Sequence, residues 1–102
     1  MRVLVTVKDK YPVPLEQFPA MLDGFVDWRE RHRDSMESFE FFAGSSGGFG
    51  ILNVPDEQTL SRIMTEYPFY LFSDIAVHPI LEGDVALRQV REIMRRMTGG
   101  EG

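Results

Sequence analysis

The order in which two hydrophobic periodicities alternate along this chain limits its fold more than any other feature. Residues 2–8 alternate apolar and polar side chains and are rich in β-branched residues, as a half-buried strand is. Residues 18–32 instead carry apolar side chains three and four positions apart, the spacing of an amphipathic helix. Pro19 places the start of this helix at about that residue. Two further strand-like runs follow, at residues 36–44 and 48–54.

A second helix and a fourth strand complete the pattern. Asp56 follows a proline and is placed as a helix N-cap, and Pro68 ends the helix. The apolar side chains between them share one helical stripe: Leu60, Ile63, Met64 and Tyr67. Residues 69–80 supply the fourth strand. After residues 81–84 a last helix carries its own apolar stripe, made of Leu87, Val90, Ile93 or Met94, and Met97.

The resulting order is β-α-β-β-α-β with an added C-terminal helix. This order is typical of a ferredoxin-like α+β domain, in which helices cover one face of a four-stranded antiparallel sheet. A chain of 102 residues has room for one hydrophobic core. We therefore expect residues 1–98 to form a single domain and residues 99–102 to form a flexible tail.

A glycine cluster in the stretch GSSGGFGILNVPD, residues 44–56, raises the question of a phosphate-binding loop. A Walker loop needs Lys followed by Ser or Thr at the start of a helix, and a dinucleotide fingerprint also leads into a helix. Here the glycines lead into a strand, so we expect a hairpin turn built on the conformational freedom of glycine. Gly50, inside the strand, indicates a bulge or the close approach of a ligand or another backbone.

The composition excludes several classes of function. The net charge of −5 lacks the basic surface that nucleic-acid binding requires. The absence of cysteine excludes disulfides and thiolate metal sites, and the two histidines lie too far apart to suggest a metal site. We expect no metal and no cofactor. No apolar run approaches the roughly 20 residues of a membrane span, so we expect a cytoplasmic protein that does not enter a membrane.

One face of the predicted sheet is left without a helix. This face is too apolar for a solvated surface and too polar for a dry core, which indicates an interface or a ligand site. The economical arrangement is a homodimer, or a higher oligomer of dimers, whose sheets face each other around a small cavity. The alternation places eight residues on this open face: Leu4, Thr6, Lys8, Glu40, Phe42, Leu52, Ala76 and His78.

Residues 47–80 resemble the second half of muconolactone isomerase. The resemblance rests on an aromatic-apolar strand, a Val-Pro pair with an acidic cap, a helix rich in Leu and Met, and a final strand. The matching residues at its end are Pro68, Phe69, Asp74, Ile75 and Val77. The first half resembles that family through VTVK, YPV and Ala43–Gly44, and a set of small bacterial domains shares the same ending. The resemblance implies a dimeric α+β barrel up to about residue 78, beyond which this chain adds a basic helix.

The resemblance also implies a reaction. An isomerase of this kind shifts a double bond by removing a proton next to a carbonyl group and returning it elsewhere, so it needs an acid–base group and a donor for the enolate. Glu40 is the first candidate base, and the alternative interpretation is that it is a solvated carboxylate on an edge strand. Asp23 is the second candidate base, because the resemblance aligns it with an acidic residue on the first helix of the isomerase. The alternative interpretation is an ordinary aspartate on a helix surface. His78 is a candidate proton shuttle, and the alternative interpretation is an exposed histidine at the end of a strand.

Five residues are candidates for binding the substrate. Thr6 and Lys8 can orient a carboxylate, lactone or phenolic oxygen, although a lysine at a strand end is ordinarily just exposed. Phe42 and Leu52 would wall the pocket. Asp74 matches the family pattern and is equally well explained as an anion that accepts hydrogen bonds from backbone donors.

The basic stripe of the last helix has two explanations. Arg88, Arg91 and Arg95 recur at spacings of three and four, as on a solvated helix face or on a surface for an anionic partner.

Two rival functions stay open beside an isomerase that acts on a lactone or an unsaturated acid. A cofactor-free monooxygenase or cyclase of aromatic polyketides would need an aromatic-lined pocket large enough for fused rings. A non-enzymatic dimeric binding or assembly module would have a filled interface in place of a cavity.

Overall fold

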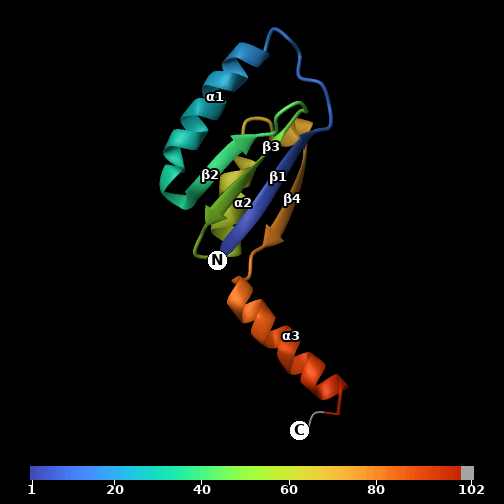
Figure 1. The fold of residues 1–102 in the computed structure, drawn as a ribbon. Helices are drawn as coiled ribbons and strands as arrows, with labels where there is room; N and C mark the ends of the chain where they lie inside the picture. The colour runs from blue at the N-terminus through green and yellow to red at the C-terminus, as the bar shows by residue number, and fades with distance from the viewer. Residues whose placement is uncertain (100–102) are drawn as a thin grey trace.

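The computed structural model describes residues 1–99 of the 102-residue chain (Figure 1). The expected order of strands and helices is confirmed, including the added C-terminal helix. The predicted tail, residues 99–102, lies outside the described residues except for Gly99. The elements are β1 (Arg2–Asp9), α1 (Phe18–Arg31), β2 (Met36–Phe41), β3 (Gly48–Asn53), α2 (Glu57–Thr65), β4 (Ser73–Pro79) and α3 (Gly83–Met97), with short 3-10 turns at Arg33–Ser35 and Tyr70–Phe72.

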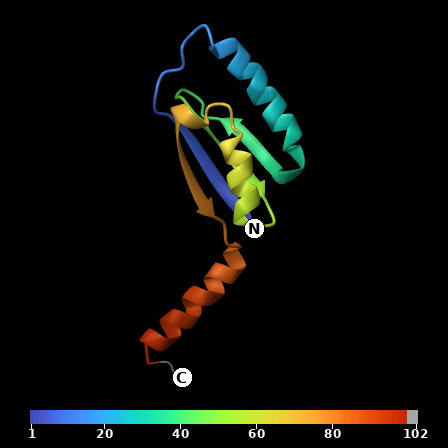
Figure 2. The same ribbon diagram turned by 180° about the vertical axis from the view of Figure 1, so that it is seen from behind.

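The four strands form one antiparallel sheet in the order β2-β3-β1-β4. Helices α1 and α2 lie on the same face of this sheet, and the opposite face carries no helix (Figures 1 and 2). The predicted ferredoxin-like α+β architecture is therefore confirmed. The open face of the sheet, which the sequence also predicted, is available to a partner or to solvent.

The core lies between the sheet and the two helices. The indole of Trp28 is fully buried and donates a hydrogen bond of 2.8 Å to the backbone oxygen of Ile63, which joins α1 to α2. At the start of α2, the carboxylate of Asp56 accepts a hydrogen bond of 2.8 Å from the backbone amide of Thr59, as an N-cap does. The buried side chains of the core are Val3, Val5, Val7, Phe25, Trp28, Phe39, Leu52, Val54, Ile63, Met64 and Tyr67.

The glycine cluster forms the expected hairpin between β2 and β3. Gly47 has a φ of 91°, which L side chains rarely adopt, and the amide of Phe42 donates to its carbonyl oxygen at 3.0 Å. A Cβ atom at Gly50 would collide with the ring of Phe39. The close approach expected at Gly50 is therefore that of an aromatic side chain packed across the strand pair.

Leu52 corrects one prediction from the sequence. It was expected on the open face, but it pairs with Val3 across the sheet and is fully buried under the helices. Its neighbours Phe49 and Ile51 take the open face instead, opposite Thr6 and Leu4. Because β3 is apolar on both of its faces, its alternation alone does not indicate which face the helices cover.

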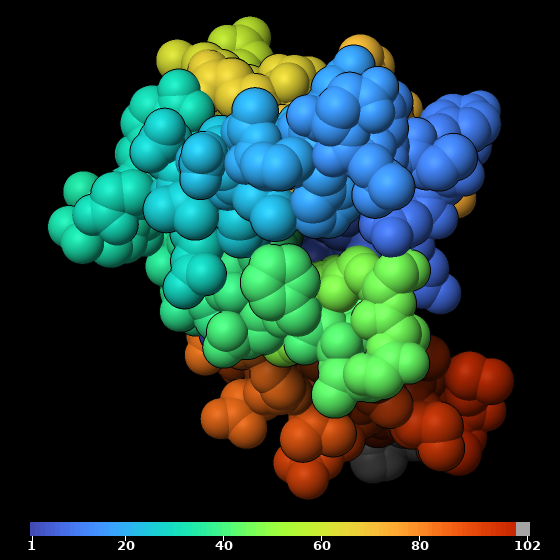
Figure 3. Space-filling view, turned by 90° about the horizontal axis from the view of Figure 1, so that it is seen from above, coloured from blue at the N-terminus to red at the C-terminus, as the bar shows by residue number. Residues whose placement is uncertain are grey.

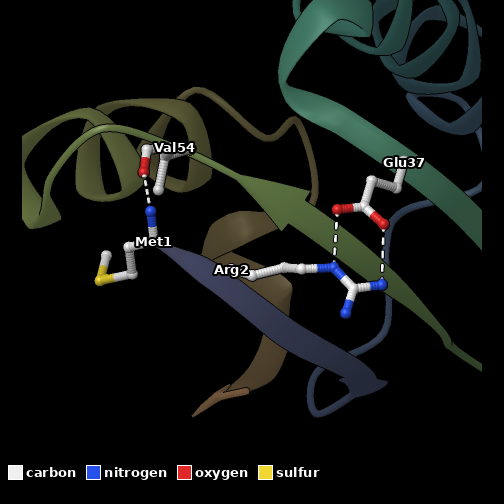
Figure 4. Close-up of polar contacts among 4 residues, drawn as sticks. All are labelled: Met1, Arg2, Glu37 and Val54. Atoms are coloured by element: carbon white, nitrogen blue, oxygen red, sulfur yellow. Dashed lines mark hydrogen bonds and ion pairs between the residues drawn. The ribbon is translucent and has the colours of Figure 1, made fainter. Parts of the chain in front are cut away.

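Polar contacts tie the start of β1 to its neighbours (Figure 4). The terminal amine of Met1 donates to the backbone oxygen of Val54 at 2.7 Å. Arg2 makes a two-pronged pair with the carboxylate of Glu37, at 2.7 and 2.8 Å. Hydrogen bonds from Arg2 lower the pKa of Glu37, yet both groups are exposed, so this pair fixes geometry more than it stabilises the fold.

Helix α3 stands apart from the rest of the chain (Figures 1 and 2). None of its residues is buried. The radius of gyration of 18.4 Å exceeds the value of about 13 Å typical of a compact domain this size, and the longest dimension is 67 Å. No helix within residues 1–99 is long and apolar enough to cross a membrane.

Candidate functional site

A cavity of about 430 Å³ lies between α1 and the sheet, at the end of the sheet where β1 finishes. Its walls come from the start of α1, the segment after β1, the β2–β3 hairpin and the segment between α2 and β4. Viewed from this end, the residues of α1 and those of the hairpin lie on opposite sides of a hollow (Figure 3). The aromatic residues that line the cavity are Tyr11, Phe18, Phe25, Phe39, Phe41, Tyr67, Phe69 and Phe72.

The local sequence explains why the cavity stays open. Gly48 pairs with Val7 on one side and Phe41 on the other, so the middle of this sheet row lacks a side chain. Pro12 and Pro14 lie in the connection from β1 to α1, where proline disfavours regular structure, and α1 begins only at Phe18. The helix therefore spans the end of the sheet without filling the space beneath its first turns.

Tyr67 is the buried polar group of this cavity. It is 8% exposed, and burial, followed by the negative charge of Asp9, raises its pKa to about 12. The hydroxyl therefore keeps its proton beyond pH 10, the ordinary pKa of tyrosine. A tyrosine hydroxyl that keeps its proton can donate a hydrogen bond to a carbonyl or enolate oxygen of a ligand.

The other polar groups lie at the rim of the cavity. Asp9 ends β1, Lys10 follows it, and both are exposed. The Lys10 ammonium lies 3.7 Å from a carboxylate oxygen of Asp74. Ser45, Ser46 and Ser73 contribute hydroxyl groups. The cavity thus combines an apolar, aromatic interior with the hydroxyl of the buried residue Tyr67 and a charged rim.

Most of the residues that the sequence selected lie on the opposite face of the sheet. One row there contains Ala76, Thr6, Phe49 and Glu40, side by side across the four strands. Lys8 lies opposite Asp74 in the next row.

The row on the other side of Thr6 pairs His78 with Leu4. The ring of Phe42 stacks on Phe49, with the two ring centres 6.1 Å apart. None of the residues selected from the sequence lines the cavity, and Asp23 lies exposed on α1. The roles assigned to Glu40, His78 and Asp23 stay predictions, as do the binding roles of Thr6, Lys8, Phe42 and Asp74.

Sequence reasoning assigned no chemical role to the polar groups that meet at the cavity. Tyr67 ends the apolar stripe of the second predicted helix, and its burial agrees with that pattern, but the stripe does not reveal the cavity that this residue lines. Asp9 and Lys10 carried a usable signal, because charged residues directly after a strand and before a proline-rich connection often serve a binding site.

Within residues 1–99, no group of three or more His, Asp or Glu side chains is placed to hold a metal ion. The chemistry available to the cavity from these residues is hydrogen bonding, proton transfer and charge pairing.

Comparisons with known proteins place this fold. No protein-family model matches the sequence, and no curated protein matches it. Among solved structures, muconolactone isomerase matches with a TM-score of 0.72 and 19% identity over 80% of this chain and 90% of that one. The 5-chloro-2-hydroxyhydroquinone dehydrochlorinase of Burkholderia phenoliruptrix AC1100, solved with 2,5-dihydroxybenzoquinone, matches with a TM-score of 0.65 and 17% identity over 82% and 97%. The resemblance that the sequence suggested is therefore confirmed for the fold, which is that of muconolactone isomerase.

Proposed function

We propose that this protein binds a small, flat, oxygen-bearing organic molecule in the cavity beneath α1 and moves a proton on it. The preferred reaction is the shift of a double bond in a lactone or an unsaturated acid. The observation that carries this proposal is the Tyr67 hydroxyl, held protonated among aromatic side chains with the Asp9 carboxylate nearby.

Each polar group has a role in the proposed reaction. The carboxylate of Asp9 takes a proton from the carbon next to a carbonyl group, and the electron pair of that C–H bond moves toward the carbonyl oxygen. Tyr67 donates a hydrogen bond to the resulting enolate oxygen. Asp9 then returns the proton to a different carbon, so the double bond shifts without an external reactant. Lys10 at the rim pairs with a carboxylate of the substrate.

The solved structures of this fold support the class of ligand. One is named for a lactone and the other for a chlorinated hydroxyhydroquinone. Both names describe small ring compounds that carry several oxygen atoms. Such compounds match an aromatic-walled cavity with a few hydrogen-bonding groups.

A second candidate function is that of a cofactor-free monooxygenase or cyclase acting on aromatic polyketides. The aromatic lining of the cavity favours it, since flat aromatic ligands stack on such side chains. The volume of about 430 Å³ lies near the lower end of the range of roughly 300–1,000 Å³ for ligand pockets. We therefore prefer a ligand of one or two rings.

We also propose that the protein is a homodimer joined through the open faces of its sheets. The half-buried side chains of Leu4, Phe49 and Ile51 give this face an apolar centre. Polar residues such as Glu40 and His78 lie around that centre.

Ligand-observed NMR with lactones, unsaturated diacids and hydroxylated quinones tests the proposed site. We expect at least one of these compounds to bind, and Tyr67→Phe to weaken it about tenfold by removing the donor. The matched control is Glu40→Gln, on the other face of the sheet, which should bind as the natural chain does. Binding lost in Glu40→Gln and kept in Tyr67→Phe would move the site to the open face.

A further inference from the structure

The apolar stripe of α3 is exposed along its whole length. Its side chains range from 52% to 77% exposed, and a helix of 15 residues with no packed face is only marginally stable in water. Arg88, Arg91 and Arg95 follow one edge of the stripe, at spacings of three and then four residues. A helix with this pattern requires a surface that is apolar in the middle and acidic along one side. The stripe consists of Leu87, Val90, Ile93, Met94 and Met97.

The outer side of α1 offers such a surface. Val26 is 63% exposed, and Leu22, which also borders the cavity, is 43% exposed, so this helix shows apolar side chains to solvent. Asp23, Asp27 and Glu30 follow one edge of that apolar strip. Their spacings are four and then three residues, the reverse of the arginine spacings on α3.

The reversed spacing specifies an antiparallel contact. Consider two antiparallel helices whose apolar strips are in contact. If each helix is viewed from its own N-terminus, residues on the same rotational side of the two strips lie on the same side of the contact. Asp23, Asp27 and Glu30 follow their strip in the same sense as the arginines of α3 follow theirs. Arg91 then lies at the height of Asp27 and Arg95 at the height of Asp23. Arg88 lies at the height of Glu30, whose carboxylate also pairs with Arg33 at 2.9 Å.

We propose that α3 docks antiparallel on the outer face of α1 in a second copy of this chain. Residues 1–82 carry seven basic and thirteen acidic residues, a net charge of −6, whereas α3 carries four basic and two acidic residues, a net charge of +2. Opposite charges on the two parts of one chain favour contact between copies. Arg88, Arg91 and Arg95 thereby gain an anionic partner, and exposed Asp23 gains a place in an interface.

The α1 helix of the same chain is out of reach. The amide of Ile80 donates to the backbone oxygen of Arg2 at 2.9 Å, which holds the chain to the sheet edge and leaves residues 81 and 82 as the free link. Two residues span about 7 Å. Crossing from β4 to β2 requires about 14 Å, for three strand spacings. Helix α2 also lies between β4 and α1 (Figure 2).

Disulfide trapping tests the contact directly, because the chain has no cysteine of its own. One chain carries Val26→Cys on α1 and a second carries Val90→Cys on α3, and the two are mixed and oxidised. We expect the mixed disulfide to form at least tenfold faster than with Gln89→Cys, an exposed control on α3 outside its apolar stripe. Equal rates for the two α3 positions would overturn the proposal.

Charge reversal supplies a second test that does not depend on thiol chemistry. Arg88→Glu, Arg91→Glu and Arg95→Glu are combined in one chain, and Asp23→Lys, Asp27→Lys and Glu30→Lys in another. In analytical ultracentrifugation with labelled chains, each variant should self-associate at least tenfold more weakly, and the two together should regain affinity. Replacing the three arginines with lysine should preserve association. A mixture no stronger than either variant alone would reject the contact, and circular dichroism confirms that every variant is folded.

Discussion

The two faces of the sheet differ although the same strands build both. On β1, the side chains of Val3, Val5 and Val7 are at most 2% exposed, while Leu4 and Thr6 between them stay half-buried. The covered face contains the aromatic core and the cavity with Tyr67. The open face contains most of the residues that sequence reasoning selected for catalysis. Catalytic residue types on a strand therefore do not indicate by themselves which face of the sheet encloses a ligand.

The largest expected effect tests which face of the sheet contributes more to the free energy of unfolding. Trp28→Ala removes a fully buried ring and its hydrogen bond to Ile63, and should lower the free energy of unfolding by about 3–5 kcal/mol in urea denaturation. Phe49→Ala on the open face, where the ring is half-exposed, should cost no more than about 1.5 kcal/mol. Equal losses in dilute, monomeric protein would contradict this difference, whereas a cost of Phe49→Ala that grows with protein concentration would reflect burial of the ring in the proposed dimer.

The rate at which the protein converts a ligand identified by the NMR screen tests which face of the sheet carries the reaction. Tyr67→Phe should reduce kcat by about 10²-fold or more, because it removes the donor to the developing enolate oxygen. Tyr70→Phe changes the same group on an exposed neighbour in the same segment and serves as the control. A Tyr67→Phe enzyme with unchanged kcat would remove this hydroxyl from the mechanism.

Alkaline titration tests the burial of Tyr67 without any ligand. The folded chain keeps the proton of Tyr67 up to a pKa of about 12, above the ordinary value of 10. Its contribution to stability is therefore complete below pH 10 and is lost as the pH rises from 10 to 12, by up to about 2–3 kcal/mol. Ultraviolet absorbance should show one of the three tyrosines ionising near pH 12, a step absent from Tyr67→Phe. Complete tyrosine ionisation by pH 11 in the folded protein would contradict the raised pKa of Tyr67.

The smallest expected effect concerns the residues first selected as catalytic. Glu40→Gln and His78→Ala lie on the face away from the cavity and should change kcat less than twofold in the same assay. A tenfold loss in either variant would reverse the comparison and place the chemistry between two open faces. Far-ultraviolet circular dichroism provides the check that both variants fold.

Much of the fold could be predicted from local physics. The N-cap at Asp56, the helix stop at Pro68 and the hairpin at the glycine cluster follow from preferences of single residues, and the structure contains all three. The site could not be predicted in the same way. The cavity needs the first turns of α1, the hairpin and the segment around Tyr67, which are far apart along the chain and meet only when the sheet assembles.

Leu52 and α3 show which structural features the sequence alone does not determine. Alternation along β3 determined that Leu52 points away from Ile51, because successive side chains of a strand point to opposite faces. Only the pairing of Leu52 with Val3, a contact between distant residues, decided that Leu52 enters the core. For α3 the sequence determined an amphipathic helix, whereas the tertiary structure decided that its apolar stripe finds no cover within residues 1–99. Periodicity is a property of neighbours along the chain, while burial depends on which distant surfaces meet.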